Sequence, residues 1–391
     1  MWYIKSALKV LLKNPIIWIL TIILAAVFAA PVYEPLRPAW ILDEITREQN
    51  KEEYENAKTN YEFALENPSF ARNLEIEKQL LELKKNIYES TTSAEYFDNN
   101  VKLIETELDQ LQSGRSIASE SPYDLQAKLL YCMAISSLGD AVNYPNSKNY
   151  PLIEMGASLF EVRTPLLLIG SAIIVSLLVH LTTGEKKLLG ITVIGNTKRL
   201  LLQTTTSCIA SVLLILTALL PTLLFALVKN GVGVTVYPIV FRRAGEIVSI
   251  NALECFLGGL LIVLCSAIFI TLCTHCIYSA IKHLLTSSLI ACAVTAALVY
   301  LPLYPRYFSV RDFNTSLIRF LPMTYFDVRN IVGYLGIWPT LQVLKDVNLK
   351  PMTALVVLTV WSLALLLLAV GITALKQAFA KGRYVQLRQC D

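Results

Sequence analysis

Long apolar runs separated by polar segments dominate the pattern of residues along this chain. An α-helix needs about 20 apolar residues to cross a hydrocarbon layer about 30 Å thick. Six segments come close to that length, namely residues 15–32, 165–181, 205–228, 252–273, 284–303 and 352–375. The pattern therefore predicts an all-α integral membrane protein with six transmembrane helices, and an even number of spans places both termini on one side.

The residues before the first span predict a separate helix that lies in the membrane interface. Lysines recur every four positions and apolar residues fill the opposite face, with Trp2 and Tyr3 at the start. The lysines are Lys5, Lys9 and Lys13, and the apolar residues are Ile4, Leu8, Leu11 and Leu12. A cleavable signal peptide is the alternative, because a basic start, an apolar run and Val27-Phe28-Ala29 fit its general pattern.

Residues 33–164, between the first two spans, carry the repeating pattern of amphipathic helices. Apolar or small residues recur at three-four spacing in three sets, and a fourth helix is expected over residues 123–138. The sets are Tyr54, Ala57, Tyr61 and Ala64; Ile76, Leu80, Leu83 and Ile87; and Val101, Ile104, Leu108 and Leu111. Asn67-Pro68 and the polar residues 90–93 separate the sets. The segment is predicted to be an α-helical domain standing outside the membrane.

Charge is distributed unevenly and supports this division of the chain. The sequence is 54% hydrophobic and 16% charged, and residues 34–163 hold 23 of the 30 acidic but only 13 of the 34 basic residues. If the N-terminus is cytoplasmic, the inner segments hold twelve lysines and arginines, and the two outer loops at residues 229–250 and 304–350 hold nine. We therefore expect cytoplasmic termini and three parts: residues 1–32, an extracellular domain at 33–164, and a transmembrane domain at 165–391.

The cysteines and histidines give little support to a metal or redox site. Seven of the eight cysteines lie in or beside apolar runs, and only Cys132 falls in the acidic segment, which therefore has no internal disulfide. Cys273-Thr274-His275-Cys276, with His283 nearby, invites a metal interpretation. Structural zinc requires four ligands in a tetrahedron, so a plain helix end is favoured and no metal site is predicted.

The predicted spans carry no ionisable side chain at their middle, since Glu254, His180 and His275 fall near span ends. Ion-coupled carriers usually keep such groups at mid-membrane depth, so the chain lacks a proton relay. Serines and threonines in the spans are expected to form hydrogen bonds between helices. They are Thr204, Thr205, Thr206, Ser207, Ser211, Ser266, Thr271, Ser287, Ser288 and Thr295.

Neither a nucleotide site nor a catalytic group is predicted in this chain. The segment from Gly190 to Lys198 nearly matches a phosphate-binding loop, but Asn196 stands where that motif requires lysine. The three histidines form no nucleophile-base arrangement with a neighbour in the sequence pattern. We therefore expect no enzyme activity, no cofactor in this chain and no nucleic-acid partner.

The segment Thr183-Gly184-Glu185-Lys186-Lys187-Leu188-Leu189-Gly190, continuing to Gly195-Asn196-Thr197-Lys198-Arg199-Leu200, is the most characteristic part of the sequence. It resembles the cytoplasmic loop between the second and third spans of type-2 ABC exporter permeases. In that family an acidic residue precedes a short amphipathic coupling helix, and a basic residue opens the third span. The resemblance implies an ATPase-coupling loop at residues 182–200 formed by Glu185, Lys187, Leu188, Leu189, Ile191, Ile194, Lys198 and Arg199.

The resemblance extends to the segment before the last span, where that family forms re-entrant helices. Residues 304–350 contain Phe320-Leu321-Pro322-Met323 and Ile337-Trp338-Pro339, which fit short broken helices. The insertion at 33–164 is far longer than in the simplest members. By this resemblance the chain is the permease subunit of a bacterial exporter in the cytoplasmic membrane, paired with a second copy or a sister permease. Two copies of a separate ABC ATPase would bind ATP and Mg.

A charge-free membrane interior favours an amphipathic or lipidic substrate, because a compact ion would be left unpaired there. The acidic outer domain would attract cationic antimicrobial peptides. The competing hypothesis is a non-transporting membrane sensor or scaffold whose outer helical domain binds an extracellular ligand. A membrane enzyme acting on lipid is a third hypothesis, which the missing catalytic constellation weakens.

Overall fold

A computed structural model of the chain describes residues 2–33, 47–67, 74–113, 122–138, 163–183, 195–230, 235–243, 246–281, 283–300, 319–326, 328, 331 and 349–388. Helices form at all six apolar segments, and the mostly helical fold class is confirmed. These helices are α2 (Pro15–Tyr33), α8 (Arg163–Thr183), α9 (Asn196–Asn230), α10 (Ala252–Ala280), α11 (Leu284–Tyr300) and α14 (Pro351–Arg388).

The helices differ in whether their length suffices to cross a membrane. The apolar parts of α9, α10 and α14, which are Asn196–Val228, Ala252–Ala280 and Pro351–Phe379, are long enough by length and composition. A fourth candidate combines α2 with α1 (Trp2–Leu12), and these two helices are bent by 72°. The described apolar parts of α8 and α11 are shorter, at Leu167–Thr182 and Leu284–Ala297. Three or four spans are therefore supported, and six stays a prediction.

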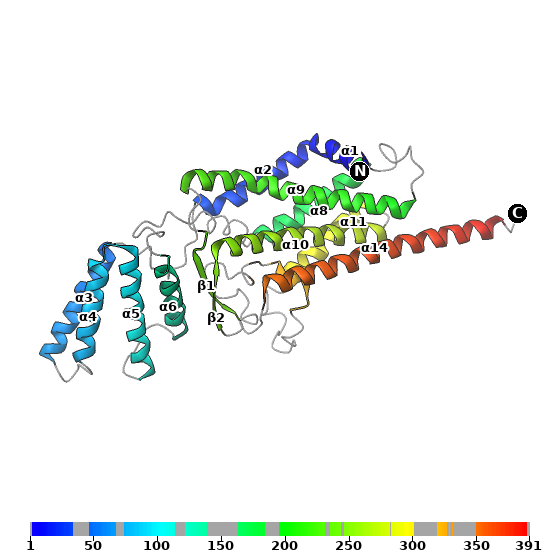
Figure 1. Cartoon of the computed structure of the whole chain (residues 1–391). Coiled ribbons are helices and arrows are strands. Elements are labelled where there is room, and N and C mark those ends of the chain that lie inside the picture. The colour runs from blue at the N-terminus through cyan, green and yellow to red at the C-terminus, as the bar shows by residue number, and fades with distance from the viewer. Residues whose placement is uncertain are drawn as a thin grey trace.

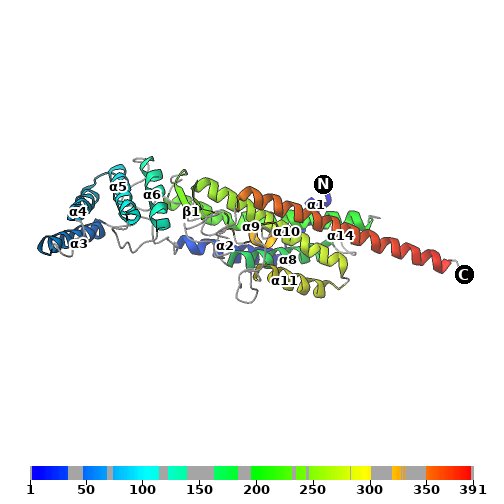
Figure 2. The ribbon, with the colours of Figure 1, turned by 90° about the horizontal axis from the view of Figure 1, so that it is seen from below.

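The apolar helices run along the long axis of the molecule with α10 at their centre (Figures 1 and 2). α10 contacts α8, α9, α11 and α14, and it buries residues along most of its length. It begins at Ala252 because the side chain of Asn251 accepts a hydrogen bond from the N–H of Glu254 at 2.7 Å. Both termini lie at the end of the molecule opposite to helices α3–α6 (Figure 1).

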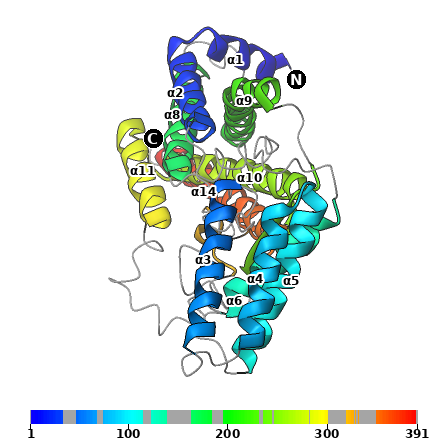
Figure 3. The same ribbon diagram turned by 90° about the vertical axis from the view of Figure 1, so that its left-hand side faces the viewer.

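The insertion contains four described helices where the periodicity predicted them. They are α3 (Arg47–Glu66), α4 (Leu74–Glu89), α5 (Ser93–Gln112) and α6 (Pro122–Ser136). Each contacts the next along the chain, and Figure 3 shows them side by side at one end of the molecule. The rings of Tyr54 on α3 and Tyr88 on α4 stack with centroids 6.0 Å apart. The described helices of the insertion therefore form a bundle that is held together by apolar contacts between neighbouring helices.

A β-hairpin that the sequence pattern did not predict connects the insertion to the apolar helices. Strands β1 (Pro238–Arg243) and β2 (Glu246–Asn251) pair antiparallel between α9 and α10, in a segment expected to be an outer loop. α6 packs on both strands, and the hydroxyls of Tyr131 and Tyr237 form a buried hydrogen bond. An aromatic chain runs from Phe97 through Tyr131 to Tyr237 with ring centroids 6.3 and 6.0 Å apart. The two hydrophobic regions are thus continuous.

The segment predicted to be re-entrant is described only in part. A 3-10 helix, η5 (Pro322–Tyr325), forms at the predicted Phe320-Leu321-Pro322-Met323, whereas Ile337-Trp338-Pro339 lies outside the described residues. The indole N–H of Trp361 on α14 donates to the carbonyl of Phe320 at 2.9 Å, which fixes this turn against α14.

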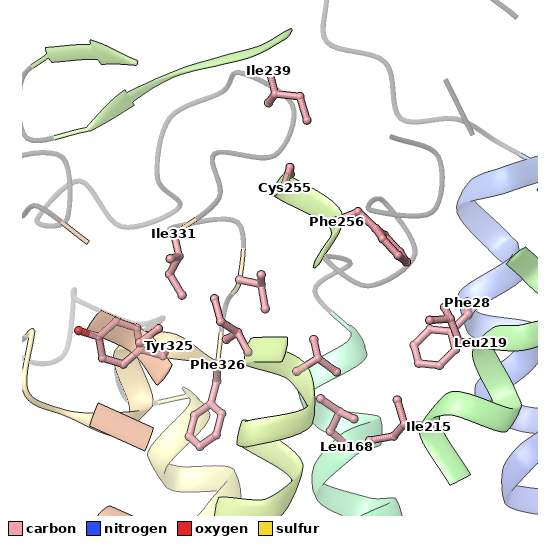
Figure 4. Close-up of a cluster of buried hydrophobic side chains, with 14 of the residues drawn as sticks. Phe28, Leu168, Ile215, Leu219, Ile239, Cys255, Phe256, Tyr325, Phe326 and Ile331 are labelled. Carbon is pink, nitrogen blue, oxygen red and sulfur yellow. The ribbon is translucent and has the colours of Figure 1, made fainter. Parts of the chain in front are cut away.

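One buried cluster joins the helices to this turn (Figure 4). Phe28, Leu168 and Leu219 bring α2, α8 and α9 together on one side of the cluster. Phe326 lies on the other side of the cluster. Its ring is 5.8 Å from that of Phe269 on α10. The core therefore runs through the whole set of apolar helices.

Candidate functional site

The predicted ATPase-coupling loop, residues 182–200, connects α8 to α9. The end of α8 and the start of α9 lie at the end of the molecule that holds both termini (Figure 1). The middle of the loop, residues 184–194, lies outside the described residues. Six of the candidate residues fall there: Glu185, Lys187, Leu188, Leu189, Ile191 and Ile194. Their role stays a prediction.

The other two candidates, Lys198 and Arg199, lie on the first turn of α9. Lys198 is exposed and Arg199 is half-buried. The N–H of Arg199 donates to the carbonyl of Gly195 at 3.0 Å, so the helix is already formed at this point. α9 thus begins nine residues before Thr205, where the predicted span starts, and it extends the bundle toward the loop.

Polar side chains meet where α8, α9 and α11 pack around α10. His275 of α10 is 1% exposed, and its Nε2 lies 2.9 Å from the hydroxyl oxygen of Ser207 on α9, which is fully buried. In an apolar surrounding each of these groups would be costly to bury alone. The hydrogen bond therefore connects α9 to α10 at a defined register.

Tyr278 extends the same group of side chains to the remaining two helices. Its ring packs edge-on against His275, with centroids 5.8 Å apart, and against His180 of α8, with centroids 5.5 Å apart. Its hydroxyl lies 2.9 Å from the hydroxyl of Ser288 on α11. We call His180, Ser207, His275, Tyr278 and Ser288 the four-helix polar cluster.

The four-helix polar cluster retains unused hydrogen-bonding capacity. The Nδ1 atoms of His180 and His275 are buried without a hydrogen-bond partner, as is the hydroxyl of the neighbouring Thr204. Arg199, at the start of α9, lies within electrostatic reach of His180. The first turn of α9 is therefore close enough to the end of α8 for a charge on Arg199 to be felt at His180.

α14 is attached to the same end of α10. The ammonium group of Lys376 donates to the carbonyls of Ser279 and Ala280, at 2.6 and 2.8 Å. These carbonyls belong to the last turn of α10, where backbone acceptors have no partner within the helix. The lysine therefore completes the C-terminus of α10 from a neighbouring helix.

The sequence pattern found the polar residues but not their grouping. The sequence pattern favours a plain helix end at Cys273-Thr274-His275-Cys276, whereas in the structure His275 connects two helices. Among the residues that the structure describes, no three of His, Cys, Asp or Glu gather in a way that could hold a metal ion. A buried polar residue in an apolar helix usually faces the bundle interior, and that rule could have singled out His275.

The expected hydrogen bonds between helices are found at some of the predicted serines and threonines. The hydroxyl oxygens of Ser211 on α9 and Thr271 on α10 lie 3.3 Å apart. Within the four-helix polar cluster, Ser207 bonds to His275 and Ser288 bonds to Tyr278. Thr206 and Thr295 donate instead to carbonyls one turn back in their own helices. The serine and threonine hydroxyls therefore bond either to a side chain of a neighbouring helix or to a backbone carbonyl of their own helix.

No family model matches this chain, and neither the curated proteins nor the solved structures gave a match.

Proposed function

We propose that this chain is the permease subunit of an ATP-driven ABC exporter with six spans. A separate ATPase would dock on residues 182–200, and the cargo would be an amphipathic or lipidic molecule such as an antimicrobial peptide. The observation that carries the proposal is the four-helix polar cluster, whose member His180 lies on the last turn of α8, the helix that leads into the predicted docking loop. A push on α8 or α9 at the loop would reach α10 and α11 through these side chains.

The direction of the helices supports the same proposal. α8 ends and α9 begins at the loop, α10 ends and α11 begins nearby, and both termini lie at this end (Figures 1 and 2). Apolar helices that alternate in direction in this way suit six crossings. The insertion then lies on the opposite, extracellular side.

The coupling loop itself requires a covering surface. Leu188, Leu189, Ile191 and Ile194 lie within a short segment flanked by charged residues. Such apolar side chains are stabilised by a groove on a partner, and helix-in-groove docking is a common form of recognition. On this proposal the groove belongs to the ATPase, and Glu185, Lys198 and Arg199 set the register at its rim.

The test replaces Leu189 and Ile194 with aspartate in one variant. We expect this Leu189→Asp/Ile194→Asp protein to insert normally, to lose the ATPase during purification and to lose ATP-dependent transport. The control is Phe63→Asp/Leu65→Asp, which adds the same charges at exposed apolar positions of α3. Full transport and a retained ATPase in the loop variant would exclude this loop as the coupling element.

The second candidate is a membrane sensor or scaffold, and the contact between α6 and the β-hairpin favours it. A ligand bound by the outer helices could shift Tyr131 against Tyr237 and so reach α10, which follows β2 directly. This function needs no ATPase. The sensor or scaffold function would gain support if no ATPase copurified with the wild-type protein and if the loop and control variants gave the same results in both measurements.

A further inference from the structure

Helix α1 presents three different stripes, each repeating every four residues. Tyr3, Ala7 and Leu11 are buried against the protein, where α1 contacts α8 and α9. Lys5, Lys9 and Lys13 are all exposed, and Lys13 directly follows the last helical turn. Between these two stripes lies an apolar edge whose last member, Leu12, is 57% exposed.

The angle between α1 and α2 is set by local hydrogen bonds at Asn14-Pro15. The side-chain oxygen of Asn14 accepts from the N–H of Ile16 at 3.0 Å, which caps α2, and Pro15 suits the first position of a helix. The indole N–H of Trp18 donates to the carbonyl of Leu12 at 2.8 Å, across the bend. The two helices are bent by 72°, so if α2 crosses a membrane, α1 lies near its surface.

The exposed surface of α2, the helix that follows α1, is suited to lipid rather than to a protein partner. The outward face of α2 exposes Ile16, Ile19, Ile22 and Ile23, and Trp18 at its start is half exposed. A continuous apolar face with an interfacial tryptophan is typical of contact with hydrocarbon at the headgroup boundary. If α2 crosses the membrane, the 72° bend places α1 along its surface, and the three exposed lysines would then lie at the depth of lipid phosphate groups.

We propose that Lys5, Lys9 and Lys13 form a binding surface for the phosphate groups of anionic phospholipids. The three ammonium groups have one sign and lie on one face, and no ion pair with an acidic residue is recorded for them within the described residues. Each basic residue close to a membrane surface contributes a similar favourable free energy to the binding of anionic lipid. The inference rests on the placement of α1 at the membrane surface and is independent of the transport function.

The test uses the full chain reconstituted in nanodiscs of equal parts phosphatidylglycerol and phosphatidylcholine. The protein is then extracted in mild detergent, and the retained lipids are counted by mass spectrometry. We expect the wild type to retain phosphatidylglycerol in excess of the bulk ratio. In the Lys5→Gln/Lys9→Gln/Lys13→Gln variant this excess of phosphatidylglycerol should fall roughly fivefold or more below that of the wild type. High salt should lower the excess in the wild type and much less in this variant.

Two further variants separate charge from folding. Lys51→Gln/Lys58→Gln/Lys102→Gln removes three exposed charges from α3 and α5 and should keep the wild-type excess. Lys5→Arg/Lys9→Arg/Lys13→Arg keeps the charge and should keep the excess as well. An unchanged excess in the glutamine variant of α1 would overturn the proposal. So would a glutamine variant that keeps the lipid but loses a copurifying protein, because the lysines would then bind protein.

Discussion

The outer helices and the long apolar helices expose opposite kinds of side chain, although both bury apolar residues. α5 buries Tyr96 and Phe97 and exposes Glu105 and Asp109, which is the arrangement of a protein in water. α9 and α10 bury Ser207, Thr271 and His275 and expose large apolar residues. Those exposed residues include Leu213, Leu216, Leu220, Leu224, Leu253, Leu257 and Leu261.

This difference in the exposed side chains shows that the two regions are suited to different solvents. In water the leucines of α9 and α10 would form an exposed apolar patch far larger than a soluble protein carries. In hydrocarbon the same leucines are stable, and the buried hydroxyls and imidazoles supply hydrogen bonds that lipid cannot offer. One chain therefore follows two sets of packing rules, and the β-hairpin with α6 marks where they meet.

The largest expected effect tests the water-type core of the insertion. Phe97→Ala removes a fully buried ring that contacts Tyr96 and Tyr131, so it should lower the stability of the outer helices by about 3–5 kcal/mol. Pulse proteolysis of the full chain in urea measures the change. Leu289→Ala, at a position of α11 that is 71% exposed, is the control and should change stability little. Equal losses in both variants would contradict the comparison.

A single charge placed in each region should give the next largest difference. Leu363 on α14 and Phe63 on α3 are almost equally exposed, at 54% and 56%. A lysine near the middle of a membrane helix costs about 3 kcal/mol, whereas a lysine on a water-exposed helix is tolerated within about 0.5 kcal/mol.

Thermal unfolding in nanodiscs of Leu363→Lys and Phe63→Lys compares the two positions. We expect a lower unfolding temperature, or reduced membrane insertion, only for Leu363→Lys. If Phe63→Lys were the more damaging change, α14 would not face hydrocarbon.

The four-helix polar cluster should contribute a smaller amount. Ser207→Ala removes the hydroxyl that bonds His275 across two helices, and interhelical hydrogen bonds in membrane proteins are worth about 0.6 kcal/mol on average. Ser176→Ala is the control, because this equally buried hydroxyl donates only to Ala172 in its own helix. Unfolding by denaturant in detergent should separate the two variants, and a larger loss for Ser176→Ala would reject the role given to the cluster.

The smallest effect concerns the N-terminus of α5. The N–H and hydroxyl of Thr91 both donate to the Glu95 carboxylate at 3.1 Å, and these bonds, the backbone one first, lower the pKa of Glu95. A carboxyl group with a lowered folded-state pKa stabilises the fold above its unfolded pKa, and this contribution is lost as pH falls through the folded value.

Urea unfolding of the outer helices at pH 7 and in acid tests this linkage. Glu95→Gln should show a slightly weaker loss of stability in acid than the wild type. Glu105→Gln, at another exposed position of α5, is the control and should follow the wild type. Identical acid dependence in all three proteins would remove the capping role of Glu95.

Most of the helices could be predicted because each carries its own periodicity or apolar length. The three-four pattern of Ile76, Leu80, Leu83 and Ile87 predicted α4, and the breaks at Asn67-Pro68 and near Ser90 agree with the ends of α3 and α4. Such signals are local, so they survive without knowledge of the tertiary fold.

The hairpin and the polar cluster escaped prediction for different reasons. The runs Ile239-Val240-Phe241 and Ile247-Val248 carry a strand signal, but they are short and lie between two strongly apolar helices. His275, Ser207 and Tyr278 are brought together by the rotation of α9 and α10 about their axes, which periodicity does not determine. The middle of the predicted coupling loop lies outside the described residues, so those six residues remain predictions.

The most direct test is whether the two ends of the molecule lie on opposite sides of the membrane. Lys5 of α1 and Lys102 of α5 are both exposed and can each be replaced by a single cysteine in a background without the native cysteines. A membrane-impermeant maleimide should label Lys102→Cys in intact cells and Lys5→Cys only after permeabilisation. Labelling of Lys102→Cys only after permeabilisation would place the insertion in the cytoplasm and contradict the proposed orientation.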